Sequence, residues 1–191
     1  MPKPWRLVAT ERLASVRVFR IRGDWAVSPR TGQVSRFTIL EGREWVNVVP
    51  FTDEGGLVMV RQYRHGAREV TLEIPGGIVD DGERPARTAA RELREETGYR
   101  ARSIVPLGWC WPNPATQTNR LHSFLALGCR RVGRVQPDER EDLEPVLVPF
   151  ARVPSLVAKG EIRHALVLAA FALLHSRQGP LVQGRRRRPV R

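Results

Sequence analysis

The stretch that most constrains the fold is "GGIVDDGERPARTAARELREETG", residues 76–98, because it predicts a loop followed by a short helix. Pro85 suits the first turn of a helix, where a backbone N–H is not needed. Alanine and leucine then recur at helical spacing, and Gly98 suits the position just past a helix C-terminus. The sequence therefore predicts a helix that begins near Pro85 and ends before Gly98.

The end of this helix carries three carboxylates, those of Glu92, Glu95 and Glu96. At about 100° per residue, Glu92 and Glu96 lie one turn apart on one side of the helix, with Glu95 beside them. Like charges at this spacing repel by roughly a few tenths of a kcal/mol per pair, which a bound cation would relieve. Carboxylate oxygens without nearby His or Cys suit Mg²⁺ or Mn²⁺, and through the metal a phosphate. A solvated face with Arg91 paired to Glu95 is the alternative interpretation of this run.

The residues around the helix have a further regular spacing. Gly77 is followed after five residues by Glu83, and after seven more by the run "RELREETG", residues 91–98. This spacing resembles the signature of the Nudix hydrolases, G-x5-E-x7-R-E-U-x-E-E-x-G-U, where U is aliphatic. Only the last position departs, because Tyr99 stands there. The resemblance implies an α/β fold, an α/β/α sandwich with a mixed sheet and a loop–helix–loop motif. It also implies metal-dependent hydrolysis of a nucleoside diphosphate linked to another group.

The resemblance gives each charged residue of the signature a role. Glu92 and Glu96 are implied as direct metal ligands, and Glu95 as a ligand or as a base close to the metal. Arg91 is implied to orient the carboxylates through ion pairs, and Glu83 to support that pair or the waters of the metal. Substitution of a diphosphate by water needs neutralised phosphate oxygens and an activated water, which metal ions held by carboxylates can supply.

Two glycines precede the loop. Gly76 and Gly77 follow Pro75, and the absence of side chains lets their backbone approach a metal closely. By the resemblance, the carbonyl of Gly76 is implied as a further metal ligand. A tight turn after Pro75 explains the same two glycines and is compatible with that role.

A wider resemblance, over about residues 35–176, is to the ADP-ribose pyrophosphatase branch of the family. In "VRQYRHGAREVTLEIPGG" it implies that Arg64 contacts the pyrophosphate and that Glu73 belongs to the substrate site. In "PDEREDLEPVLVP" it implies a catalytic base, with Glu139 as the first candidate and Glu141 as the second. The signature helix is the alternative source of the base.

The loop "WPNPATQTNRLHSFLA" departs from the "P-x-P-G" form that is common in this branch, so the sequence leaves the substrate undecided. Asn119 and Arg120 are candidates for contacts with the leaving group. Trp109 and Trp111 fit either stacking on a base or packing in the core. The four histidines have no metal-ligand spacing, and we expect them to pack or to lie at the surface: His65, His122, His164 and His175.

Runs of β-branched and aromatic residues predict the strands. They cover residues 15–28, 33–42, 70–74, 103–109, 120–127 and 144–150, with a hairpin formed by 44–51 and 57–64. Two helices are predicted near 151–158 and 161–176. We expect an N-terminal β appendage over residues 1–45, a hydrolase domain over 46–178 and a tail over 179–191. The resemblance implies a homodimer with the N-terminal strands at the interface.

The formal net charge of +12 is carried almost wholly by arginine, since lysine occurs only at Lys3 and Lys159. We expect the arginine-rich end of the chain to be solvated, rather than to bind nucleic acid or a membrane. The positive remainder suits an anionic ligand. Cys110 and Cys129 match no metal spacing and predict two buried thiols in a reducing cytoplasm. The longest apolar run, residues 165–174, is too short to span a bilayer.

Three functions remain open at this stage. The favoured one is a Mg²⁺- or Mn²⁺-dependent hydrolase that cleaves ADP-ribose or a nucleotide sugar to two monophosphates. The second is a regulator that binds ADP-ribose without turnover, which the complete set of signature glutamates disfavours. The third is a hydrolase of RNA 5′ ends that uses the basic surface, for which binding would depend steeply on salt.

Overall fold

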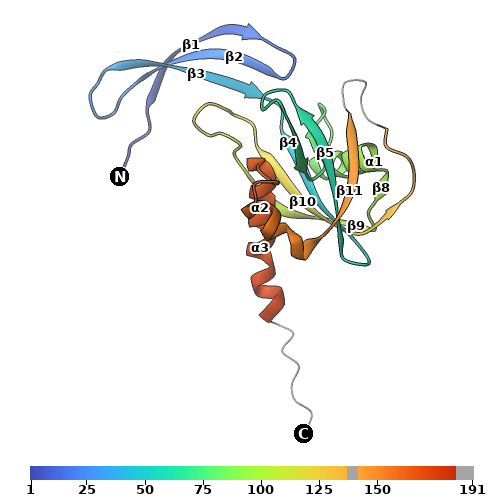
Figure 1. The fold of residues 1–191 in the computed structure, drawn as a ribbon. Coiled ribbons are helices and arrows are strands. Elements are labelled where there is room, and N and C mark those ends of the chain that lie inside the picture. Colours follow the sequence, from blue (N-terminus) through green and yellow to red (C-terminus); the bar gives the residue numbers. More distant parts are fainter. Residues whose placement is uncertain (137–141, 184–191) are drawn as a thin grey trace. The chain divides into compact units, whose positions relative to one another are not determined.

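The computed structural model of the protein describes residues 1–136 and 142–183. The chain forms two compact units (Figure 1). Unit 1 consists of residues 1–44 and 111–120, and unit 2 consists of 45–110 together with the described residues from 121 onward. The two candidate bases, Glu139 and Glu141, and the arginines of the C-terminal tail lie outside the described residues.

Unit 1 is built on an antiparallel sheet of three strands in the order β1-β2-β3. The predicted strand over 15–28 is wrong at its start. The N–H of Val16 donates to the carbonyl of Phe19, which makes a turn there, and the residues before the turn form a strand of their own. The three strands are β1 (Arg6–Ser15), β2 (Phe19–Val27) and β3 (Val34–Gly42).

Residues 111–120 belong to unit 1 because their backbone pairs with strand β3. The N–H of Leu40 donates to the carbonyl of Thr116 at 2.7 Å, and the N–H of Thr118 donates to the carbonyl of Leu40 at 3.1 Å. Unit 1 is therefore discontinuous in sequence, which the expected boundary at residue 45 did not foresee. That boundary remains a prediction.

Unit 2 contains an eight-stranded sheet. Its main order is β11-β5-β4-β10-β8, while β6 also pairs with β5, β7 with β4 and β9 with β10. Strands β4 and β10 are parallel and the other pairs are antiparallel, so the sheet is mixed, as predicted. The strands are β4 (Trp45–Thr52), β5 (Gly56–Arg64), β6 (Glu69–Glu73), β7 (Gly76–Ile78), β8 (Tyr99–Arg100), β9 (Ser103–Cys110), β10 (Leu121–Arg131) and β11 (Leu143–Pro149).

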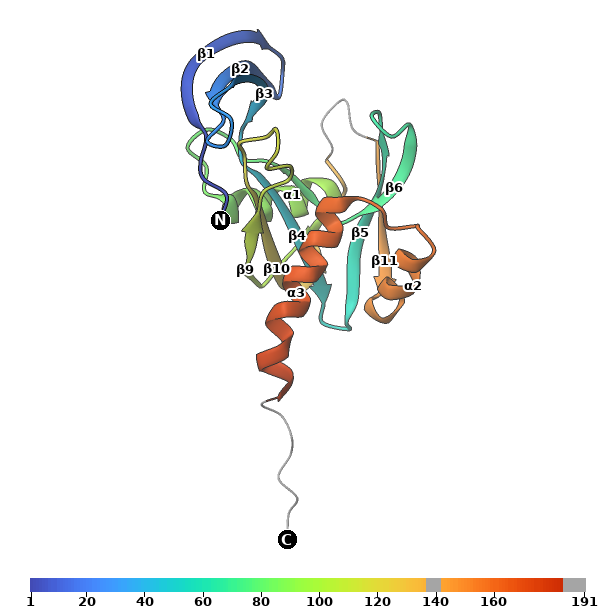
Figure 2. The same ribbon diagram turned by 90° about the vertical axis from the view of Figure 1, so that its left-hand side faces the viewer.

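Helices cover both faces of this sheet, which confirms the predicted α/β/α sandwich (Figures 1 and 2). Alternate residues of β4 point to opposite faces, as strand geometry requires. Val48 packs with Leu93 in the cluster on the side of α1 (Pro85–Thr97), whereas Val49 packs with Val167 in the cluster on the side of α2 (Val153–Ala158) and α3 (Ala165–Gln183). A short 3₁₀ helix, η1 (Phe150–Arg152), precedes α2.

Helix α3 begins at Ala165, four residues later than predicted. The residues before it are tied back to α2, because the N–H groups of Glu161 and Ile162 both donate to the carbonyl of Leu156. The hydrogen bonds of α3 start at His164, whose carbonyl accepts the N–H groups of Val167 and Leu168. Among the described helices, none is both long and apolar enough to cross a membrane.

Candidate active site

Helix α1 has the start and the end that its sequence predicts. Pro85 lies in the first turn, and Gly98 takes a left-handed φ of 74° and donates its N–H to the carbonyl of Arg94. A side chain at residue 98 would also meet the backbone of Gly133, so both conformation and space favour glycine there. The buried side of α1 holds Ala89 and Leu93 in the core, which leaves the adjoining side to carry the charged residues.

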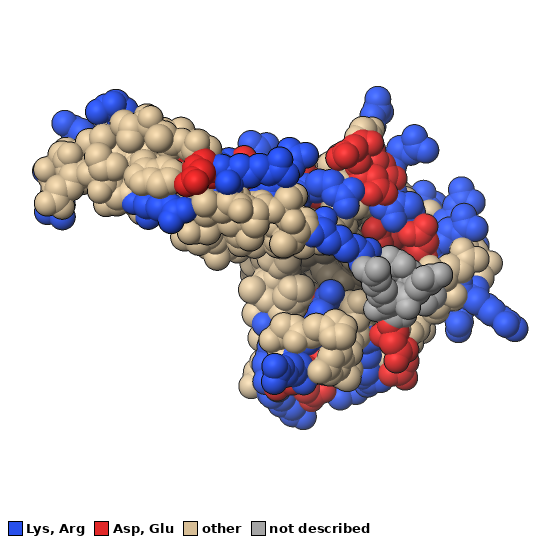
Figure 3. All heavy atoms as spheres, turned by 90° about the horizontal axis from the view of Figure 1, so that it is seen from above, with Lys and Arg blue, Asp and Glu red and all other residues tan. Residues whose placement is uncertain are grey.

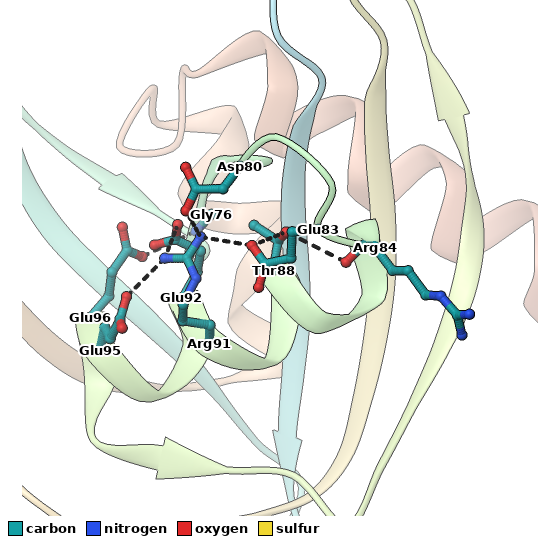
Figure 4. A network of polar contacts seen from close by, with 9 residues as sticks. All are labelled: Gly76, Asp80, Glu83, Arg84, Thr88, Arg91, Glu92, Glu95 and Glu96. Carbon is teal, nitrogen blue, oxygen red and sulfur yellow. Dashed lines mark hydrogen bonds and ion pairs between the residues drawn. The ribbon is translucent and has the colours of Figure 1, made fainter.

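Arg91 lies at the centre of the carboxylate cluster (Figure 4). Its Nη1 donates to Oε1 of Glu92 and to Oε2 of Glu95, both at 2.9 Å, and the pair with Glu95 has the predicted spacing of one helical turn. Its Nη2 lies 3.2 Å from Glu83 and 3.6 Å from Asp80. Partial burial alone would lower the pKa of Arg91, but the surrounding carboxylates raise it. The single guanidinium of Arg91 thus interacts with four carboxylates.

Glu83 is held from a second side by Thr88. The Thr88 hydroxyl donates to Oε2 of Glu83 at 2.8 Å, and Arg91 approaches the same oxygen. The hydrogen bond from Thr88 is the main reason that the pKa of Glu83 lies below its ordinary value, and Arg91 lowers it further. Glu83 therefore stays ionised at neutral pH with its carboxylate in a fixed orientation.

The two glycines of the loop contact the helix directly. The N–H of Gly76 donates to Oε2 of the buried Glu96 at 3.0 Å. A Cβ on Gly77 would lie only 2.2 Å from Oε1 of Glu92, and a Cβ on Gly76 only 2.4 Å from the carbonyl oxygen of Val46. Glycine at residue 77 lets the strand come this close to Glu92, and glycine at residue 76 lets it pack against β4.

The residues present fit a divalent cation in chemical type. The donors are carboxylate oxygens, and Gly76 and Gly77 place a bare backbone against Glu96 and Glu92. Across residues 1–136 and 142–183, no three acidic, His or Cys side chains converge as a metal-binding group. In this arrangement the positively charged guanidinium of Arg91 contacts both Glu92 and Glu95.

The predicted phosphate-binding pair also comes together. Arg64, at the end of β5, makes two hydrogen bonds to Glu73, the last residue of β6, at 2.8 and 2.7 Å. Two residues, Ile74 and Pro75, lie between Glu73 and Gly76, so even an extended chain places the Cα atoms of Glu73 and Gly76 at most roughly 10 Å apart. The Arg64–Glu73 ion pair and the carboxylate cluster are thus connected by one short stretch of backbone.

The remaining candidates are Asn119, Arg120 and the two tryptophans. Asn119 and Arg120 belong to unit 1, and their assignment to the substrate remains a prediction. Asn119 is 1% exposed, and neither polar atom of its amide has a hydrogen-bond partner in the described part of the chain. Packing in the core, the commoner use of such tryptophans and the one expected for Trp109 and Trp111, is wrong, because Trp109 is 43% exposed and Trp111 is 51% exposed.

Comparison with known proteins places this arrangement in a family. A model of the NUDIX domain matches residues 43–171. The chain belongs to the Nudix family. Its sequence is 33% identical over 171 residues to an ADP-ribose pyrophosphatase of Mycobacterium tuberculosis, a match that covers 88% of this chain and 82% of the relative. It is 31% identical over 175 residues to an ADP-ribose pyrophosphatase of Bacillus subtilis, a match that covers 91% of this chain and 94% of the relative.

The fold of this Nudix hydrolase is also similar to a solved structure. The crystal structure of an ADP compounds hydrolase superposes with a TM-score of 0.83 at 24% identity, covering 97% of this chain and 98% of that one. The family and the curated relatives make the protein an enzyme, a hydrolase of diphosphate linkages.

Sequence reasoning missed three polar residues around these clusters. Asp80 stands in the acidic loop before the helix, and that position was its only signal. Thr88 falls among the seven variable residues of the signature, so spacing could not single it out. His164 was expected to pack or to lie at the surface, yet its ring contacts Glu73.

Proposed function

We propose that this Nudix hydrolase cleaves the diphosphate linkage of ADP-ribose or a related nucleotide sugar to two monophosphates, with Mg²⁺ or Mn²⁺. The observation that carries the proposal is the carboxylate cluster of α1, held against the bare backbone of Gly76 and Gly77. The choice of substrate is supported by the two relatives named ADP-ribose pyrophosphatase, each of which matches most of this chain.

The metal would be held by Glu92, Glu95, Glu96 and the carbonyl of Gly76. When bound, a divalent cation neutralises phosphate oxygens and lowers the pKa of a coordinated water. Glu96 is already oriented by its hydrogen bond from Gly76. Arg91 keeps Glu92 and Glu95 close to each other, since one Nη1 atom contacts both.

The diphosphate itself would be bound by Arg64. A guanidinium suits this task, because its planar set of donors matches the oxygens of a phosphate. The Arg64 side chain is 43% exposed, and Glu73 contacts its Nε and Nη2 atoms. Arg64 would contact the substrate at the end of β5, while the metal ion would contact the substrate at the end of α1.

For the catalytic base, Glu139 and Glu141 remain proposed beside Glu95. The described residues that flank them support this choice. The N–H of Gln136 donates at 2.7 Å to the carbonyl of Glu95, and Leu143 pairs with Gln62 on β5, two positions before Arg64. The chain between Gln136 and Leu143 thus starts at the carboxylate helix and ends beside the strand of Arg64.

We also propose a homodimer that uses the sheet of unit 1. Every residue of β1 is exposed, and the exposed set includes large apolar side chains that a monomer would leave in water. Trp5 and Phe37 stack edge to face at 5.3 Å on this sheet. A second copy of the chain is the partner that the family resemblance implies. The apolar residues concerned are Trp5, Leu7, Val8, Leu13, Val34 and Phe37.

Among the described residues, the arrangement of basic side chains gives little support to RNA as the substrate. Figure 3 shows basic side chains on both units of the face drawn, with acidic side chains beside them. Several arginines are paired, among them Arg61 with Glu144 and Arg130 with Asp53. We therefore assign the excess charge to attraction of a small anionic substrate.

The proposal is tested by turnover of a substrate panel with Mg²⁺, Mn²⁺ or EDTA. The panel contains ADP-ribose, GDP-mannose, diadenosine polyphosphates and a triphosphorylated RNA. We expect AMP and ribose 5-phosphate from ADP-ribose, and no product in EDTA. Preferred release of pyrophosphate from the RNA would contradict the proposed substrate. Binding of ADP-ribose without turnover under every metal condition would contradict the proposed reaction.

A further inference from the structure

Among the described residues outside the signature helix, Glu73 is the carboxylate with the most hydrogen-bond partners. It is 2% exposed, and four donors lie within hydrogen-bond distance of its two oxygens. Oε1 receives Nε of Arg64 at 2.8 Å and the hydroxyl of Thr71 at 2.5 Å. Oε2 receives Nη2 of Arg64 at 2.7 Å and faces Nδ1 of His164 at 2.7 Å.

These contacts keep Glu73 ionised in spite of its burial. Burial, the largest single influence, would raise the pKa of Glu73, but Arg64, His164 and Thr71 together bring it well below the ordinary value. Each oxygen already has two partners, which uses the hydrogen-bonding capacity of the carboxylate. Glu73 is therefore placed to act on Arg64 rather than to contact a substrate itself.

Arg64 gains a defined orientation from this carboxylate. A two-point contact through Nε and Nη2 fixes the plane of the guanidinium as well as its position. This contact restricts the rotamers of Arg64, which lowers the entropic cost of ordering the side chain when a ligand binds. Glu73 thus contributes to the direction in which the guanidinium of Arg64 points.

His164 also contacts Oε2 of Glu73, and the backbone of His164 is anchored. Its carbonyl accepts the N–H of Val167 at 3.0 Å, which places His164 at the start of α3. The same end of α3 is tied to the sheet by the side chain of Asn47, whose Nδ2 donates to the carbonyl of Leu166 at 2.9 Å. The start of α3 and strand β6 can be followed in Figure 2. The imidazole is therefore presented to Glu73 by a rigid helix end.

We propose that His164 is a positioning residue for substrate binding. Through Glu73 it holds the guanidinium of Arg64 in the orientation that meets the diphosphate. Nδ1 carries the proton in this contact, because the carboxylate can only accept. The inference rests on the proposed function, in which Arg64 binds the diphosphate, and it changes the role of Glu73 from substrate contact to support of Arg64.

The test compares His164→Leu, which removes the N–H donor, with His164→Asn, whose amide can place an N–H near the position of Nδ1. Turnover of ADP-ribose with Mg²⁺ is measured for both. We expect His164→Leu to raise KM about tenfold and to keep kcat within about twofold of the wild-type value. The reason is that the variant loses one charge-assisted hydrogen bond that supports substrate binding. His164→Asn should recover most of the affinity. His175→Leu, a change of an exposed histidine on the same helix, is the matched control and should leave KM unchanged.

A double-mutant cycle separates positioning from a general loss of structure. If His164 acts through Arg64, then His164→Leu has no further effect on KM in the Arg64→Ala background. Additive effects, or equal losses in His164→Leu and His164→Asn, would overturn the inference. Thr71→Val removes another donor to Glu73 and should raise KM in the same direction, which provides a second variant if His164→Leu does not fold.

The failure of this inference differs from the failure of the proposed function. An unchanged KM in Arg64→Ala would show that Arg64 does not bind the diphosphate, and the inference would fall with that role. A raised KM in Arg64→Ala together with an unchanged KM in His164→Leu would overturn the positioning role alone.

Discussion

The N–H of Gly76 donates to Oε2 of Glu96 at 3.0 Å, so the first residue of strand β7 and a residue twenty positions later on α1 are held together. This contact joins the short strand β7 to the carboxylate cluster. It fixes Glu96 within a buried environment, where an unpaired carboxylate would be costly. The glycines and the glutamates of the signature therefore form one structural unit.

Gly77→Ala should damage activity more than stability. The added Cβ would lie 2.2 Å from Oε1 of Glu92, and the flexible end of that side chain can move away. A displacement of about 1 Å in such a group costs on the order of a hundredfold in rate. We expect kcat to fall by about that factor, with a melting temperature close to that of the wild type.

Changes at two other glycines, Gly76 and Gly66, serve as controls for Gly77→Ala. At Gly76 a Cβ would meet the backbone oxygen of Val46 at 2.4 Å, so Gly76→Ala should lower stability by about 2 kcal/mol. At Gly66 a Cβ meets nothing within 4 Å, and Gly66→Ala should change neither property. Full activity in Gly77→Ala would contradict the role given to its contact with Glu92.

Thr88→Val should shift the acid side of the pH–rate profile to higher pH. The Thr88 hydroxyl is the main cause of the lowered pKa of Glu83, so its removal raises that pKa towards the ordinary range. The ionised form of Glu83 is then lost at a higher pH as the solution is acidified. Thr88→Ser keeps the hydroxyl and should retain the wild-type profile. Identical profiles for Thr88→Val and the wild type would show that the charge of Glu83 is not needed.

Glu73→Gln should destabilise the protein at neutral pH and less so in acid. Because the folded pKa of Glu73 lies below its ordinary value of 4.5, its stabilising effect is present above that pH and is lost as the pH falls further. We expect a loss of roughly 2–3 kcal/mol in the free energy of unfolding at pH 7. The difference from the wild type should shrink in urea unfolding at pH 3. A difference that is equal at both pH values would contradict the ionised state of Glu73.

Phe37→Asp tests the proposed dimer through unit 1. Phe37 is an exposed apolar residue that stacks with Trp5, and a carboxylate there would disfavour burial against a second copy. Sedimentation should show a dimer for the wild type and a monomer for the variant. Val70→Asp, an exposed change in unit 2, is the control and should remain dimeric. A monomeric wild type at micromolar concentration would contradict the proposed dimer.

The sequence predicted the signature helix well because its limits are set locally. Pro85 and Gly98 mark its ends through backbone conformation, and no distant contact is needed to recognise them. The β4–β5 hairpin was predicted correctly for the same reason, since a short turn with Gly55 and Gly56 joins its strands.

The features that the sequence did not predict depend on tertiary contacts. The ring of His164 meets Glu73 across ninety-one positions of the chain, and no spacing rule connects the two. The pairing of Leu40 with residues 116–118 places a later segment in unit 1, again without a local signal. Thr88 lies at a variable position of the signature, so only the geometry of the helix shows that it contacts Glu83.

The most direct test of the account measures Mn²⁺ binding and ADP-ribose turnover together in Glu96→Gln. This change removes one negative charge from the cluster at nearly constant volume, while Glu54→Gln alters an exposed glutamate in the β4–β5 turn as a control. Mn²⁺ binding is followed by electron paramagnetic resonance and turnover by release of AMP. The account predicts that Glu96→Gln loses affinity for Mn²⁺ by at least about tenfold and loses turnover, whereas Glu54→Gln keeps both. Wild-type affinity and turnover in Glu96→Gln would contradict the assignment of the metal site to helix α1.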